Sequence, residues 1–105
     1  MATFTKIKGQ LDGIKSTYTT TLDDSESEIV KAPPVPCTIS VIPGANTGLV
    51  QYTTSPESDI DDASATWQEW SKGSVTSNTS SILLGNVSGL KFSATGGEVT
   101  FEIVT

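Results

Sequence analysis

The chain has 105 residues, and its six lysines stand against 12 acidic residues, so the formal net charge is −6. This acidic balance, with no arginine, argues against nucleic-acid binding, which depends on lysine and arginine to neutralise phosphates. The chain also lacks histidine, the usual general base and the commonest metal ligand at neutral pH.

Alternation of apolar and polar residues predicts strands along most of the chain, because successive side chains of a strand point to opposite faces of a sheet. The alternation is clearest at residues 37–42 and 99–104. Runs rich in β-branched and aromatic residues predict further strands at 3–8, 15–22, 49–54, 65–70, 81–84 and 89–94. With turn residues between them, about eight short strands indicate an all-β, antiparallel β-sandwich that is jelly-roll-like and has an N-terminal arm or hairpin.

Two interpretations are open for residues 57–70. Pro56 followed by acidic residues is typical of a helix start, and a helix would place Ala63, Trp67 and Trp70 on one face. Ser64 and the strand-like flanks favour instead an acidic loop that leads into a strand at 65–70. We favour the loop and strand.

The amino-acid composition of the chain also changes at a proline-rich junction. Residues 1–36 are polar, whereas residues 37–105 contain both tryptophans and most of the alternating runs. We expect an N-terminal part of arms or strands over 1–36 and a sandwich core over 37–105, together in one compact domain. Either the stiff stretch 33–36 is a crossover loop inside one sandwich, or residues 1–32 are an arm or hairpin that contacts a neighbouring chain.

No catalytic or cofactor site is expected. Serines are plentiful, but without histidine they lack the usual activating base. The acidic segment with Glu57, Asp59, Asp61 and Asp62 is either a solvated loop or a calcium site, and it departs from the EF-hand pattern. The solvated loop is the favoured interpretation, so we expect no metal, no cofactor and no enzymatic activity. No run approaches the ~18 apolar residues of a membrane span.

Five residues are assigned structural roles. Cys37 alternates with core positions and is expected to be a small buried apolar residue. Trp67 is expected in the core. Trp70, on the opposite face of a strand, is expected to point outward, either as an interface anchor, which we favour, or as a platform on which a sugar stacks. Gly96 and Gly97 are expected to form a hairpin turn before the last strand.

The stretch from Thr38 onward resembles small β-sandwich virion proteins of tailed bacteriophages. The resemblance rests on ISVIPG at 39–44, LVQYTTS at 49–55, ATWQEWSKG at 65–73, VSGLKF at 87–92 and GEVTFEI at 97–103. The WxxWxxG element at 67–73 is its most distinctive part. Lys91 stands where similar chains usually have arginine.

The resemblance implies a structural role, most simply capsid decoration, also called cementing. The chain would then bind the outer surface of the virion head as a homo-oligomer and stabilise contacts between major capsid proteins, with no nucleic-acid or membrane partner. The alternative is a tail or fibre component that binds host glycan or other tail proteins. Under the decoration hypothesis, the contact residues are expected to be Phe4, Lys6, Lys8, Lys15 and Trp70, with the lysines meeting an acidic patch.

Overall fold

A computed structural model describes residues 5–7 and 17–105 of the chain. In these residues it contains a set of short strands and one short helix. They are β1 (Thr5–Ile7), β2 (Thr17–Leu22), β3 (Ser27–Lys31), β4 (Cys37–Ile42), β5 (Thr47–Thr53), α1 (Glu57–Asp61), β6 (Gln68–Glu69), β7 (Thr79–Leu83), β8 (Gly89–Thr95) and β9 (Val99–Val104). No helix in the described part of the chain is long and apolar enough to cross a membrane.

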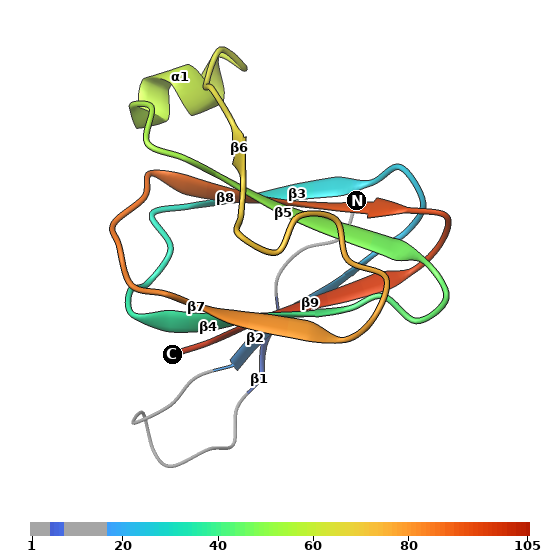
Figure 1. The fold of residues 1–105 in the computed structure, drawn as a ribbon. Coiled ribbons are helices and arrows are strands. Elements are labelled where there is room, and N and C mark those ends of the chain that lie inside the picture. Colours follow the sequence, from blue (N-terminus) through green and yellow to red (C-terminus); the bar gives the residue numbers. More distant parts are fainter. Residues whose placement is uncertain (1–4, 8–16) are drawn as a thin grey trace.

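The strands form two antiparallel sheets that stack face to face (Figure 1). The first sheet has the order β1-β2-β9-β4-β7, and the second has the order β3-β8-β5-β6. We call them sheet 1 and sheet 2. Between β5 and β7 the chain makes an excursion through α1 and β6 that rises above sheet 2 (Figure 1).

The pairing of the strands is nested. β2 pairs with β9, β3 with β8, β4 with β7 and β5 with β6. Such nesting is what results when one long antiparallel ribbon is wound around itself, and it is the topology of a jelly roll. The predicted all-β, jelly-roll-like sandwich is therefore confirmed, with β1 added at the edge of sheet 1.

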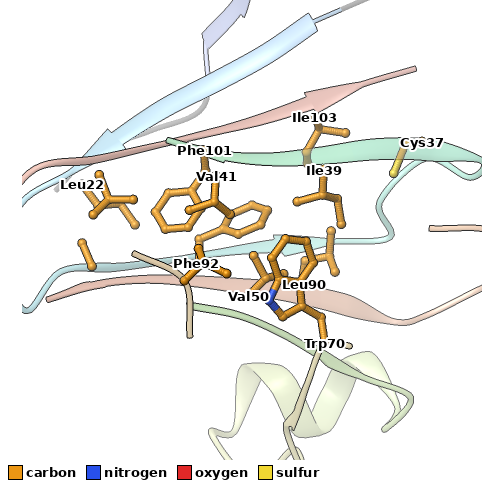
Figure 2. Close-up of a cluster of buried hydrophobic side chains, with 13 residues drawn as sticks. Leu22, Cys37, Ile39, Val41, Val50, Trp70, Leu90, Phe92, Phe101 and Ile103 are labelled. Carbon is orange, nitrogen blue, oxygen red and sulfur yellow. The ribbon is translucent and has the colours of Figure 1, made fainter. Parts of the chain in front are cut away.

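The core lies between the sheets and is made by the inward side chain at every second position of the central strands (Figure 2). In β9 these are Val99, Phe101 and Ile103, and in β8 they are Leu90, Phe92 and Ala94. The Phe92 and Phe101 rings, one from each sheet, stack with centroids 4.9 Å apart. This pair joins the two sheets at the centre of the molecule, and burying each ring is worth about 2–3 kcal/mol.

Gly48 on β5 permits the close approach of the two sheets. A Cβ at this position would lie 2.6 Å from Val41 Cγ1 and 2.9 Å from Val99 Cγ1, both on the opposite sheet. Neither valine can withdraw, because both are completely buried. The absence of a side chain at 48 is therefore a packing requirement.

Most of the predicted strands are present, with three corrections. β3 was not predicted, because Ser27, Glu28 and Lys31 give it a polar composition. The proposed strand at 65–70 is reduced to the two residues of β6, and the helix start after Pro56 leads to a helix that ends at Asp61. Gly96 and Gly97 do form a turn, but it joins β8 in sheet 2 to β9 in sheet 1 and is not a hairpin.

The segment before the prolines contributes to both sheets. β2 pairs with β9 over its whole length, and β3 pairs with β8 from Ser27 to Lys31. The proline-rich stretch then carries the chain from β3 in sheet 2 to β4 in sheet 1. It acts as a crossover connection between the two layers.

Replacing Gly48 with alanine tests the packing between the sheets. We expect Gly48→Ala to lower the free energy of unfolding by about 1–3 kcal/mol, because the new methyl group overpacks a filled core. Urea unfolding followed by circular dichroism measures the change. Gly85→Ala is the matched control, since nothing lies within 4 Å of a Cβ there, and it should change stability by less than about 0.5 kcal/mol. Equal effects of the two substitutions would contradict the packing argument.

Candidate binding surface

The interior of the sandwich is occupied by apolar side chains. Leu22, Val41, Val50, Phe92 and Phe101 are each fully buried between the sheets. A cavity of about 330 Å³ lies at the open side between β7 and the β5–β6 edge. It is lined by core residues such as Val50 and Leu90 together with Tyr52, Glu69 and Leu83, and we call it the side groove.

The titratable groups do not gather into a site in the described part of the chain, where no cluster of three or more cysteine, aspartate or glutamate side chains could hold a metal ion. Burial raises the pKa of the Cys37 thiol, which makes it less nucleophilic at neutral pH. Burial, aided by the charge of Glu26, raises the pKa of Glu28. One Glu28 carboxylate oxygen is buried without a hydrogen-bond partner. These isolated groups do not form a nucleophile–base pair.

The acidic segment that follows β5 is partly helical. Glu57, Asp59 and Asp61 lie in α1, and Asp62 ends it. Asp61 accepts a hydrogen bond from Lys31 Nζ of β3 at 2.7 Å, so this ion pair ties the excursion to sheet 2. The same contact raises the pKa of Lys31 above its ordinary value.

The two tryptophans have the reverse of their expected roles. Trp70 is only 8% exposed and belongs to the core (Figure 2). Its Nε1 donates to the Gly73 carbonyl oxygen at 2.7 Å. Its assignment as an outward interface anchor is therefore wrong. Trp67 is half-buried outside the core, with Lys91 Nζ 5.0 Å from its ring centroid. The two rings do lie on opposite faces, as alternation along a strand requires, and the error lies in which face was assigned to the core.

The excursion covers part of the outer face of sheet 2. Ile60 of α1 is buried, and a Cβ at Gly89 of β8 would lie 2.9 Å from Ile60 Cδ1 and 3.5 Å from Trp67 Cη2. The glycine thus leaves room for two apolar side chains on the outside of the sheet. Lys91 and the Lys31–Asp61 pair add charge to the same region.

In the described part of the chain, no element covers the outer face of sheet 1, and this face carries almost no charge. Its side chains alternate with the core residues and form three rows across the paired strands. The rows are Thr21, Thr100 and Ile42; then Thr19, Glu102, Ser40 and Ser80; then Thr17, Val104, Thr38 and Ile82. Glu102 is their one charged member. We call this surface the hydroxyl face.

The hydroxyl face is made of small side chains held in register. The hydroxyl groups of Thr21 and Thr100, on neighbouring strands, are hydrogen-bonded at 3.0 Å. Two shallow depressions of about 260 Å³ each are bordered by its residues, one by Ser40, Ser80 and Glu102 and the other by Thr38, Ile82 and Val104. A protein partner could therefore seat side chains against it without displacing a dense layer of charge.

The sequence contained only part of the signal for this face. The alternation of Thr17, Thr19 and Thr21 is visible in the sequence, but which strands lie beside β2 is not. Only the nested pairing places these threonines next to β9 and, through β9, next to β4. Of the contact residues proposed from the sequence, Phe4, Lys8 and Lys15 lie outside the described residues. For Lys6 the structure gives only the backbone pairing with Tyr18.

Comparison with known proteins shows the fold and no family. No family model matches the chain, and no curated protein matches it in sequence. A solved structure, reported in a study of the mechanism of oxalate oxidase, is similar with a TM-score of 0.53 and 13% sequence identity. The match covers 86% of this chain but 40% of that chain, so this chain spans less than half of the protein it resembles. At this identity the likeness supports the sandwich architecture alone.

Substituting the two tryptophans separately tests their places in the fold. Trp70→Ala should lower the free energy of unfolding by about 3–5 kcal/mol, because it opens a cavity in the core and removes the hydrogen bond to Gly73. Trp67→Ala should cost only about 1 kcal/mol, since it removes a half-exposed ring and its contact with Lys91. Urea unfolding measures both. A larger loss at Trp67 would restore the assignment made from the sequence.

Proposed function

We propose that this chain is a structural protein of a bacteriophage virion that decorates the outer surface of the capsid and acts by adhesion. The observation that carries the proposal is the hydroxyl face, a sheet surface that no described element covers and whose rows contain a single charge in an otherwise acidic protein. The resemblance of residues 38–103 to small virion proteins of tailed phages supports the same role.

The composition of the hydroxyl face suits association. Burying a charged side chain without a partner is costly, whereas a threonine or serine hydroxyl can exchange its water for a hydrogen bond across an interface. The methyl groups of threonine, with Ile42, Val104 and Ile82, add apolar area. Covering a face of this kind therefore costs little desolvation free energy, and a cementing protein needs a surface with this property.

Glu102 gives the face a point of specificity. It lies in the middle row, with Thr19 and Ser40 as its neighbours on the adjacent strands. A lysine or arginine of the capsid protein that reached it would form a charge-assisted hydrogen bond at the centre of the contact. Such a bond fixes orientation, because only one arrangement of the partner satisfies the carboxylate.

The proposal includes no catalytic activity. The chain has no histidine, and the described interior is packed with apolar side chains and holds no cluster of metal ligands. Adhesion has a direct physical effect on a capsid. A protein that binds the assembled shell and not its free subunits shifts the equilibrium toward the shell by mass action. Several copies bound along one seam add avidity.

Binding to undecorated phage heads tests the proposal. Ser40→Lys places a long charged side chain beside Glu102, where it occupies the carboxylate and projects from the hydroxyl face. We expect this variant to bind purified heads at least about tenfold more weakly than the parent protein, a change of about 1.4 kcal/mol. Co-sedimentation over a range of protein concentrations measures the dissociation constant.

Ser93→Lys is the matched control. Ser93 is also half-buried and lies on a central strand, β8, but its side chain belongs to the outer face of sheet 2. It should bind heads within about twofold of the parent. Equal binding by all three proteins would remove the hydroxyl face from the mechanism, and failure of the parent protein to bind heads would refute the decoration proposal itself.

A further inference from the structure

The free edges of the two sheets differ in charge. Within the described residues, the edge strands are β1 and β7 in sheet 1 and β3 and β6 in sheet 2. An exposed edge can pair with a strand of another molecule, and proteins commonly prevent this with a charged residue or a very short strand. β1 contains Lys6, β3 contains Glu28 and Lys31, and β6 has two residues, one of them Glu69.

β7 has neither form of protection. Its five residues, TSSIL, are uncharged, and no charged residue occurs anywhere between Lys72 and Lys91. A second uncharged stretch, between Lys31 and Glu57, contains β4 and β5, but both of these are paired with strands on each side. β7 is therefore the described strand whose free edge is open to another chain.

Two large apolar side chains at this edge are exposed. Ile82 is 65% exposed and Leu84, directly after the strand, is 75% exposed, which are the two highest values among the exposed large apolar residues of the described chain. Ser81 and Leu83 alternate with them, point toward the sandwich and line the side groove. A strand added beside β7 would extend sheet 1 across the mouth of that groove.

We propose that β7 pairs with β7 of a second copy of this chain, so that the two copies form a dimer with one continuous sheet. The lack of charge at this edge permits a second copy as the partner. Two molecules that each have a net charge of −6 repel one another over most of their surfaces, and the uncharged stretch 73–90 lets them approach at this edge without placing like charges together. The contact is isologous, since a twofold axis brings the same strand from both copies.

Antiparallel pairing about this axis is self-complementary. It places Ile82 and Leu84 of each copy on the outer face of the joined sheet, beside the same residues of the other copy. The inward residues, Ser81 and Leu83, of each copy then lie over the side groove of its partner, whose walls include Val50 and Leu90. Main-chain hydrogen bonds would supply affinity and the groove would supply apolar burial, as in other cases of strand addition.

Sedimentation equilibrium of the free, full-length protein tests the dimer without any capsid. Edge pairing by one short strand buries less area than a standard interface, so we expect a monomer–dimer equilibrium with a dissociation constant of about 10–500 μM. Ile82→Lys should weaken association at least about tenfold, because it places two like charges close together at the axis. Its side chain is exposed, so thermal unfolding should show a fold as stable as that of the parent.

Ile29→Lys is the control. Ile29 is an exposed isoleucine on the edge strand β3, which already carries charge, and its substitution should leave the dimer unchanged. Hydrogen exchange gives a second measurement, in which protection of the amides of 79–84 should rise with protein concentration.

Three results would overturn the inference: a monomer at every concentration, an Ile82→Lys variant that still dimerises, or protection that appears on another edge. These measurements do not involve capsids, so they can fail while the decoration proposal stands, and the reverse also holds. The Ser40→Lys variant separates the two proposals, because it should lose binding to heads and keep the dimer.

Discussion

The contact between the two sheets is the interaction on which the rest of the structure depends. Phe92 and Phe101 stack at its centre, and the alternating residues of β4, β5, β8 and β9 close around them. Because every second residue of a strand is committed to this contact, the remaining residues are free to form the outer faces. The inside accounts for the stability of the chain, and the outside is left to determine what it binds.

The outer residues of sheet 1 are rich in threonine and serine. Thirty of the 105 residues are threonine or serine, and on sheet 1 these two residue types occupy most of the positions that alternate with the core. A hydroxyl on a β-branched side chain favours a strand and interacts well with water, but it can also be buried against a partner. A small acidic protein can in this way remain dispersed when free and still present a surface that associates.

Much of the fold could be predicted from the sequence, because alternation and turn residues are local signals. The strands at 37–42 and 99–104 follow directly from them. The errors occurred where a non-local contact decides the outcome. Trp70 lies in the core directly after a two-residue strand. The sequence of β3 is polar, and this segment is a strand because it pairs with β8. The hydroxyl face and the unprotected edge of β7 depend on strand order, which no local pattern contains.

The central claim is that many copies of this protein bind at repeated sites on a capsid and act there by adhesion. Its copy number in purified virions tests this claim most directly, by quantitative mass spectrometry against the major capsid protein. A decoration protein should be present in a fixed ratio to the capsid protein, on the order of hundreds of copies per particle, because symmetry repeats its binding site over the shell. A handful of copies, or none, would contradict the account and favour the tail or no virion role at all.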